Sequence, residues 1–405
     1  MSWKEVTAVK SRHEFVLAAL GSGANISELC REAGISRRVG YKWIHRFKQL
    51  GIVGLEDQKR GPRPDPDPAV GEMVMEIVRQ RNLHPTWGPQ KLRVILLRSH
   101  PEDEVPSERT IGRVLGKCGM VPPRRQGHSG GIRLQQGLPA QAPNDVWTID
   151  FKGWWHVRNG IRCDPLTLRD EYSRYLFAIQ ALPSLKWEGV RAVMERVFEQ
   201  YGMPKVIHSD NGRPFAASNG LCGLTKLSAW WLALGIDLYR NRPRHPQDNG
   251  GHERMHRDVR AELQVDPKAD LATQQEAFDA WRMDFNMVRP HEALGQRTPA
   301  QVYNSSNRPY PGHVDSVAYP KHMDVRVVRR RGTIRYLNRE CYLTEALSNW
   351  PVGLELSPKD RLRVWFANVC LGETDARFGS PLHPPAFAAS QGDKPQLVNG
   401  ELLPK

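Results

Sequence analysis

Three carboxylates stand in stretches that a chain of alternating strands and helices could bring together. Asp150 lies mid-way along a stretch whose alternating character predicts a strand. Asp210 follows the β-branched run at 205–207 and begins an Asp-Asn-Gly turn, so it stands where a buried strand ends. Glu253 lies in the first turn of a helix expected from about 249 to 263. Taken alone, Asp-Asn-Gly is also a common sequence in hairpin turns, where the Asp side chain is exposed to solvent.

The chemistry open to three such carboxylates depends on a cation. Anionic groups that converge on one point repel one another, and their proton affinity rises unless a cation lies between them. Oxygen ligands with open coordination positions suit Mg²⁺ or Mn²⁺. Two such ions bracketing a phosphate activate an attacking hydroxyl and stabilise the leaving oxygen. We therefore expect Asp150, Asp210 and Glu253 to hold two Mg²⁺ (or Mn²⁺) ions for phosphodiester cleavage or exchange.

The stretches around these carboxylates resemble the DDE transposases of bacterial insertion sequences, whose catalytic core is similar to that of retroviral integrases. The matching residues are Trp147–Gly153, Ser209–Gly212 with Pro214-Phe215, His245–Gln247 through Asn249-Gly250 to Glu253-Arg254, Phe285-Asn286, Arg289-Pro290-His291, Leu294-Gly295, Thr298-Pro299-Ala300 and Tyr303. Asp210 and Glu253 are further apart than is commonest in that family, and the loop-like residues 216–223 account for the difference. The resemblance implies a DDE-type polynucleotidyl transferase with Asp150, Asp210 and Glu253 as its catalytic residues.

The resemblance also implies an α/β ribonuclease-H-like catalytic core over residues 144–303. The order expected there is strand, strand, strand, helix, strand, helix, strand, helix. After the Asp150 strand, the patterns predict strands at 166–170 and 174–181, a helix at 187–201, the Asp210 strand, a helix at 224–234, a strand at 235–239 and helices at 249–263 and 271–288. Arg257 and Arg260 should share the helical face of Glu253 and hold substrate phosphates, or else stand there as exposed helix cations.

The whole chain has the size and charge of a multidomain protein with a polyanionic partner. It has 405 residues and a formal net charge of +14, which favours double-stranded DNA as that partner. A membrane surface is the second candidate partner, and the lack of an amphipathic basic anchor argues against it. The chain contains no run of eighteen apolar residues, so no membrane span is expected, and Met1–Glu5 lacks a signal-peptide pattern. The six cysteines are scattered without a Cys-x-x-Cys pair, which argues against a zinc finger or a disulfide framework. A cytoplasmic, nucleoid-associated protein of a bacterium is expected.

Residues 1–60 have the pattern of a helix-turn-helix. Asn25 with Glu28 resembles a capping box, and Ser36 is the expected N-cap of a second helix. That helix should bury Val39, Trp43, Ile44, Phe47 and Leu50. Its other face carries the candidate DNA-binding residues Arg37, Arg38, Lys42 and Arg46. The pattern is typical of a helix placed in the major groove, and the alternative is a small helical bundle with a solvated basic face.

A second helix-turn-helix-like unit is expected over residues 70–121, after a Pro-rich linker at 61–69. Helices are predicted at 70–81, 88–99 and 107–118, the last capped by Ser107 and burying Ile111, Val114, Leu115 and Cys118. Arg109, Arg113 and Lys117 recur at i, i+4 and i+8 and form one basic stripe. This stripe either contacts DNA or is a solvated face. A basic linker at 122–143 follows.

The C-terminal part changes to a strand pattern over residues 320–378. Strands are predicted at 325–330, 333–337, 340–343, 352–356 and 362–366. They suggest a small β-barrel-like domain that bears Arg326, Arg329, Arg330, Arg331 and Arg335. The resemblance to transposases and integrases implies that this domain contacts DNA. Residues 380–405 are expected to be a disordered tail.

Three functional interpretations remain open at the sequence level. The first is a transposase that binds the ends of a mobile element, cleaves there and joins the freed end to target DNA. The second is a regulator derived from a transposase, which binds DNA without catalysis. The third is a ribonuclease-H-like nuclease that cuts without joining. The resemblance further implies a homo-oligomer on DNA, because two ends must be held together.

Overall fold

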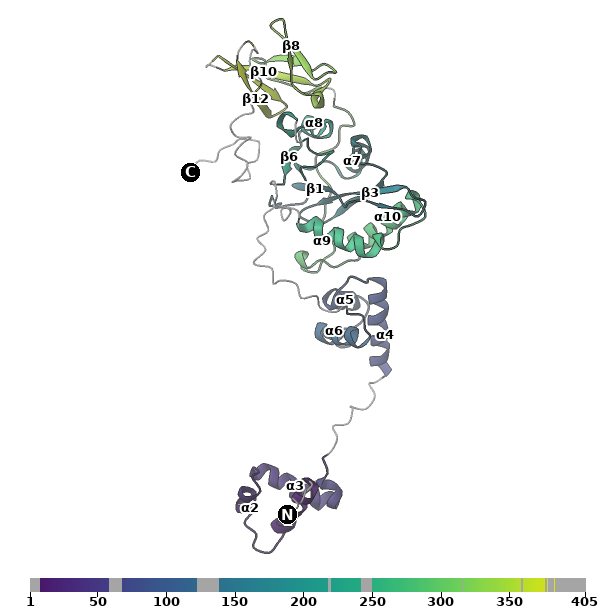
Figure 1. The fold of residues 1–405 in the computed structure, drawn as a ribbon, viewed down its shortest axis with the longest axis vertical. Helices are drawn as coiled ribbons and strands as arrows, with labels where there is room; N and C mark the ends of the chain where they lie inside the picture. Colours follow the sequence, from purple (N-terminus) through teal and green to yellow (C-terminus); the bar gives the residue numbers. More distant parts are fainter. Residues whose placement is uncertain are drawn as a thin grey trace, which may run out of the picture. The chain divides into compact units, whose positions relative to one another are not determined.

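The structure, a computed structural model, describes residues 8–57, 68–121, 138–217, 220–241, 250–314, 316–357, 360–375, 377 and 382 (Figure 1). Most of both expected linkers, the stretch 242–249 and nearly all of the expected tail lie outside these residues. The chain divides into two compact units, 1–72 and 73–405. Among the described residues, no helix is long and apolar enough to cross a membrane.

The first unit is a bundle of short helices: α1 (Ala8–Ala19), α2 (Ile26–Glu32), α3 (Arg37–Leu50) and η1 (Gly51–Leu55). Its core is formed by Phe15, Val16, Cys30, Trp43, Ile44 and Leu55. The Ser36 hydroxyl accepts a hydrogen bond from the Val39 N–H (3.4 Å), as expected of an N-cap. The expected capping box at α2 is absent, since the Asn25 side chain makes no capping bond. Val39 and Leu50, which were expected to be buried, are exposed.

The second helical unit comprises α4 (Pro68–Leu83), α5 (Pro89–Leu96) and α6 (Glu108–Lys117). Its core includes Ile77, Trp87, Leu92 and Ile111. The Ser107 hydroxyl accepts from the Thr110 N–H (3.3 Å), so the predicted cap of the last helix is present. Cys118 was expected to be buried, but it stands after the last turn of α6 and is exposed.

The catalytic-core region forms one mixed sheet, built from β1 (Val146–Phe151), β2 (Trp155–His156), β3 (Arg162–Asp170), β4 (Leu176–Leu182), β5 (Val206–Ser209) and β6 (Asp237–Arg240). Its strand order is β2-β3-β1-β5-β6, and β4 also pairs with β3. The pairs of β3 with β1 and with β4 are antiparallel, whereas β1–β5 and β5–β6 are parallel. The five strands expected from the sequence are all present, and the two-residue β2 was not predicted.

Helices cover both faces of this sheet (Figure 1). One face carries α7 (Trp187–Tyr201) and α8 (Lys226–Ala233). The other face carries α9 (Gly250–Val259), which continues into the π-helical turn η4 (Arg260–Gln264), and α10 (Leu271–Met287). Because side chains alternate along a strand, β1 sends Trp147 and Ile149 into the α7–α8 core and Thr148 and Asp150 to the α9 face. The predicted order of strands and helices is therefore present.

The C-terminal part contains β7 (Asp324–Val327), β8 (Thr333–Tyr336), β9 (Arg339–Tyr342), η7 (Glu345–Leu347), β10 (Pro351–Ser357), β11 (Arg361–Phe366) and β12 (Val369–Asp375). The described strands form an open sheet in the order β12-β11-β10-β7 and a separate β8–β9 hairpin, and not the closed barrel suggested by the sequence. Strand β12 was not predicted, because Gly372 interrupts its pattern.

The C-terminal sheet packs directly onto α8 of the core. Leu224, Ala229 and Leu232 share one buried apolar cluster with residues of the C-terminal sheet. The opposite side of α8 packs into the main core through Leu227, Trp230 and Trp231. Helix α8 is therefore covered on both sides, as is typical of a helix that carries apolar residues on all of its faces.

Candidate active site

The strand register places Asp150 and Asp210 at one edge of the sheet. Thr148 pairs with His208 across the parallel strands β1 and β5, so both strands run toward the same edge. Asp150 lies two residues beyond Thr148 and on its face, and Asp210 stands in the same relation to His208. Glu253 lies in the first turn of α9, the helix that covers this face. The two aspartates are therefore brought to one edge by neighbouring strands.

The charges of the other two carboxylates act on Asp150. Burial, together with the negative charges of Asp210 and Glu253, raises the pKa of Asp150 to about 7. Burial also raises the pKa of Asp210, although the Gly212 N–H donates to its carboxylate at 3.0 Å and opposes that effect. Glu253 is exposed. In the part of the chain that the structure describes, no three His, Cys, Asp or Glu side chains are close enough together to enclose a metal ion.

Two neighbours of Asp150 were not expected to take part in the site. The Thr167 hydroxyl donates to the Asp150 carbonyl oxygen (2.9 Å) and lies 2.9 Å from His256 Nε2. His256 Nδ1 lies 3.9 Å from the Asp150 carboxylate. Burial lowers the pKa of His256 to about 3, so its ring is neutral near pH 7 and this approach is not an ion pair there. The one sequence signal for His256 was its position three residues after Glu253, which places both on the same side of the expected helix. Such a spacing alone is a weak signal.

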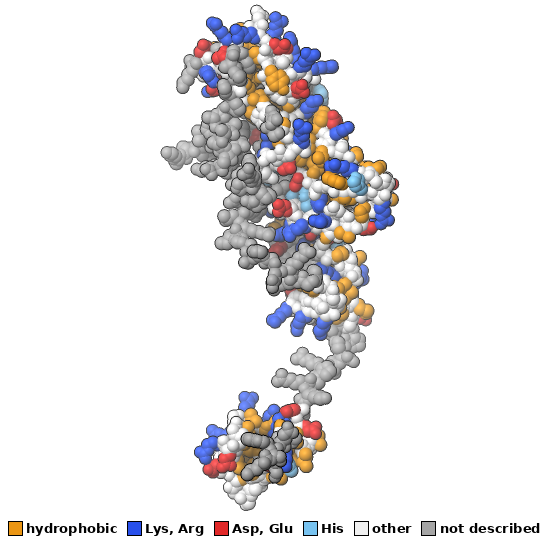
Figure 2. All heavy atoms as spheres, in the orientation of Figure 1, with side chains coloured by type: hydrophobic (Ala, Val, Ile, Leu, Met, Phe, Trp, Pro, Cys, Tyr) orange, Lys and Arg blue, Asp and Glu red, His pale blue; other side chains and the backbone are white. Residues whose placement is uncertain are grey.

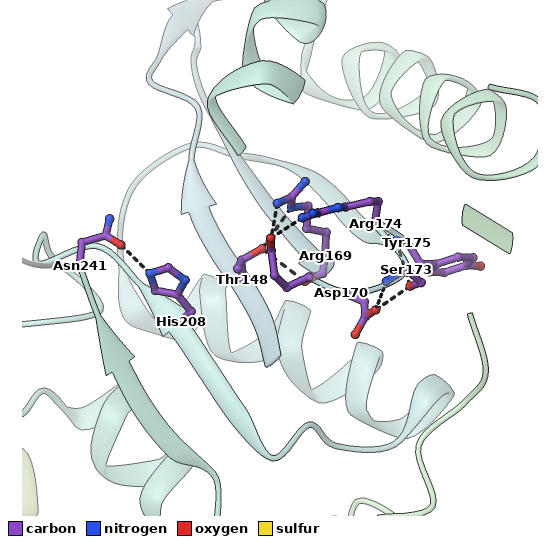
Figure 3. A network of polar contacts seen from close by, with 9 residues as sticks. Thr148, Arg169, Asp170, Ser173, Arg174, Tyr175, His208 and Asn241 are labelled. Carbon is purple, nitrogen blue, oxygen red and sulfur yellow. Dashed lines mark hydrogen bonds and ion pairs between the residues drawn. The ribbon is translucent and has the colours of Figure 1, made fainter. Parts of the chain in front are cut away.

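A buried polar network lies on the same face of the sheet (Figure 3). Arg169 on β3 is 3% exposed; its Nε donates to the Thr148 hydroxyl (3.2 Å), and its Nη2 pairs with Glu171 (2.6 Å). Burial lowers the pKa of Arg169, and the charge of Glu171 opposes this. A Cβ atom at Gly251 would overlap the Arg169 guanidinium. The first turn of α9, which carries Glu253, therefore lies directly against this buried cation.

The loop that carries Asp210 is held by the end of β6. The Asn211 side chain donates to the Asn241 carbonyl oxygen (2.6 Å), and the Asn241 N–H donates to the Ser209 carbonyl oxygen (3.2 Å). The His208 ring also contacts the Asn241 side chain (Figure 3). These contacts restrain the backbone on both sides of Asp210.

The basic residues predicted to contact DNA lie mostly on exposed surfaces. On α3, Arg37, Arg38 and Lys42 are exposed and Arg46 is half-buried. Lys42 and Arg46 lie over the Trp43 ring, 4.8 and 5.3 Å from its centre. The α6 stripe (Arg109, Arg113 and Lys117) and the pair after Glu253 (Arg257 and Arg260) are also exposed. Figure 2 shows further Lys and Arg side chains over the C-terminal β domain. Their contact with DNA stays a prediction.

Comparisons with known families match both the helical region and the core. Two models described as "Integrase core domain" match residues 140–246 and 234–299. A model described as "Helix-turn-helix domain" matches residues 12–63, and one described as "Homeodomain-like domain" matches residues 39–115. The core matches span the strands and helices that carry Asp150, Asp210 and Glu253.

Among curated proteins, this chain is similar to products of insertion elements. It is 27% identical to an IS407 protein of Burkholderia multivorans over 70% of this chain and 93% of that one. It is 24% identical to an IS476 protein of Xanthomonas euvesicatoria over 69% of this chain and 78% of that one.

Among solved structures, the catalytic core domain of BIV integrase is 23% identical over 40% of this chain and 93% of that one, with a TM-score of 0.30. The matches to family models and to insertion-element products carry the assignment: this chain is an integrase-core protein related to those of insertion elements, with helix-turn-helix domains ahead of the core.

Proposed function

We propose that this protein is a DDE transposase in which Asp150, Asp210 and Glu253 are the catalytic carboxylates. The observation that carries the proposal is the raised pKa of Asp150, which is due to burial together with the charges of Asp210 and Glu253. A buried carboxylate that is influenced by two other carboxylates marks a candidate functional site, and a cation beside it would lower the cost of its charge. The surrounding integrase core and the insertion-element relatives support the reaction class.

The donor set fits divalent ions with oxygen ligands. Asp150 and Asp210 would offer carboxylate oxygens from one edge of the sheet and Glu253 from the helix that covers this face, and a positive charge there would offset the repulsion on Asp150. We propose that they hold two Mg²⁺ or Mn²⁺ ions. When bound, these ions supply the positive charge that activates the attacking hydroxyl and stabilises the leaving oxygen.

The chain's own residues position the reactants. Thr167 and His256 hold the β1 backbone at Asp150, and Asn241 holds the loop of Asp210. We propose that Arg257 and Arg260, which are exposed, bind phosphates beside Glu253. In the proposed reaction, water attacks the phosphodiester at the element's end and frees a 3′-hydroxyl, which then attacks a target phosphodiester. No covalent protein intermediate forms in either step.

DNA binding is proposed for the helical units. The region 1–60 and the region 70–121 would read successive parts of an element end, with α3 in the major groove and the α6 stripe on phosphates. Residues 320–378 would add contacts through their exposed arginines. Because two element ends must be joined together, we propose a homo-oligomer on DNA.

The first test is a strand-transfer assay on DNA from the element's own ends with Mg²⁺ or Mn²⁺. We expect joined products from the wild type. Asp210→Asn should lower their yield by at least about 100-fold, because the reaction loses a metal-holding charge at its centre, while affinity for end DNA changes by less than about 3-fold. Asp279→Asn, an exposed carboxylate on α10, is the matched control and should retain activity.

Each alternative predicts a different result in the same assay. A nuclease yields cut DNA without joined products. A regulator binds the ends without cutting in either protein. Full activity of Asp210→Asn would contradict the assignment of the catalytic carboxylates.

A further inference from the structure

A cleft of about 600 Å³ lies where the core meets the C-terminal β domain. Its core wall includes Arg213, from the loop after β5, and the first residues of α7 and α8, Trp187 and Lys226. Its other wall includes Tyr342 at the end of β9 and Glu345 at the start of η7. Arg213 follows Asp210 by three residues, so the cleft adjoins the proposed catalytic edge.

The two walls are held together by buried contacts. Leu224, two residues before α8, and Leu232, near the end of that helix, belong to the apolar cluster of the C-terminal sheet. The Cys222 thiol donates to the Leu371 carbonyl oxygen (3.4 Å), and the Asn368 side chain donates to the Asp237 carboxylate (3.1 Å). The cleft is therefore a built feature of one packed unit rather than a gap between loosely joined domains.

The lining combines aromatic rings with cations. Tyr342 is 66% exposed, an unusual setting for a large ring. Trp187 is half-buried, and Lys226 Nζ lies 5.7 Å from the centre of its ring. Arg213 and Lys226 are both exposed, and Glu345 is the one acid among the residues that line the cleft. Rings that stack on bases beside cations that meet phosphates are the elements of a single-stranded nucleic-acid site.

We propose that this cleft receives an unpaired nucleotide of the DNA, displaced from the duplex beside the reacting phosphodiester. Its base stacks on Tyr342 and Trp187, and its flanking phosphates meet Arg213 and Lys226. A cleft of this volume suits a group of nucleotide size. This inference deepens the proposed transposase function and rests on it, because it names the part of the substrate that the cleft takes.

The test is a binding measurement on the full-length protein without divalent metal. Fluorescence anisotropy compares one blunt duplex with the same duplex carrying a tail of three unpaired thymidines, at one fixed salt concentration. The wild type should bind the tailed duplex about 10-fold more tightly, the size expected for stacking one base. Tyr342→Ala and Trp187→Ala should abolish this preference while affinity for the blunt duplex stays within about 2-fold.

Two further variants separate stacking from altered folding. Tyr342→Phe keeps the ring and should keep the preference. Tyr172→Ala removes an exposed tyrosine at the β3–β4 turn, away from the edge that carries Asp150, and should also keep it. Equal affinity of the wild type for both duplexes, or an undiminished preference in Tyr342→Ala, would overturn the proposal.

The same proteins are then tested for strand transfer, so that failure of the cleft proposal can be distinguished from failure of the transposase proposal. Joined products without a preference for the tail leave the transposase proposal standing and overturn the cleft proposal. A preference that Tyr342→Ala abolishes, in a protein that joins no DNA, supports the cleft as a nucleotide site and contradicts the catalytic proposal.

Discussion

Asp150 is a buried acid whose surroundings work against its charged form. Its pKa of about 7 in the folded protein compares with an ordinary value of 3.8. Between these two values the folded protein holds a proton that the unfolded chain has already released. The charged form therefore costs stability, and the cost grows as the pH rises from 3.8 to 7. A cost of this kind is tolerated where the carboxylate serves a function.

Replacing this carboxylate should stabilise the metal-free protein. At pH 8 the Asp150→Asn variant should gain at most about 4 kcal/mol, and at pH 5 less than half of that, because the carboxyl of the folded wild type is then almost fully protonated. The melting temperature of the core should rise by about 2–4 °C per kcal/mol. Thermal melts at the two pH values, in EDTA, measure this difference. A larger gain at pH 5 than at pH 8 would contradict the sign of the effect.

At the level of residues, the sequence was informative where one short motif carries the chemistry. Asp150, Asp210 and Glu253 each stand in a recognisable stretch, and the predicted strand ends and helix start are present. No role could be assigned to Thr167 or Arg169 from the sequence, because their contacts arise from the β1–β3 register, which pairs Asp150 with Thr167 and Thr148 with Arg169. A register between distant strands leaves no local signature in the chain.

The start of α9 shows how one element is positioned by another. Arg169 is held by Thr148 and Glu171 beneath the first turn of the helix, and its guanidinium occupies the space that a side chain at Gly251 would need. Because Arg169 is buried and bonded to Thr148 and Glu171, moving its side chain away would break these contacts and cost free energy. A side chain at Gly251 must therefore displace the helix that carries Glu253.

The adjacent glycine provides a matched control for this argument. Gly251→Ala should lower strand-transfer turnover by about 100-fold, the cost of displacing a catalytic group by about an ångström. Gly250→Ala adds the same methyl group where a Cβ meets nothing within 4 Å, and it should keep activity within about 2-fold of the wild type. Similar turnover in both variants would show that the contact with Arg169 does not set the position of Glu253.

Element prediction succeeded where periodicity was strong and failed where pairing decided the outcome. The helices and most strands were found because their apolar residues recur at regular spacing. The closed barrel was not, because closure requires the first and last strands to pair, and here β7 and β12 remain the edges of an open sheet. Strand β12 ends in Gly372–Asp375, whose residue types favour turns, yet Thr374 is fully buried opposite Leu362.

At the scale of the whole molecule, positive charge is distributed over several separate surfaces. The chain carries a net charge of +14, and its exposed cations lie on α3, on α6, beside Glu253 and in the C-terminal β domain. Phosphate contacts release counterions, so each one steepens the fall of affinity with salt. Affinity for element ends should therefore depend strongly on salt.

The contribution of the α6 stripe can be measured from that dependence. Changing Arg109, Arg113 and Lys117 together to Gln should reduce the slope of log K against log salt by about 2–3, at about 0.9 per lost phosphate contact. Lys268→Gln, which removes a cation paired with Asp266, should leave the slope unchanged. Titrations on end DNA over a range of salt concentrations give both slopes. An unchanged slope in the triple variant would show that the stripe faces solvent and does not contact DNA phosphates.

The two-sided packing of α8 also bears on how such proteins can diversify. One side of this helix belongs to the main core, and the other belongs to the apolar cluster of the C-terminal sheet. A recombination event that exchanged only the C-terminal domain between relatives would leave Leu224, Ala229 and Leu232 facing a foreign surface. The C-terminal sheet and the α8 residues that it covers must therefore change together, and the inner side of α8 must still fit the main core.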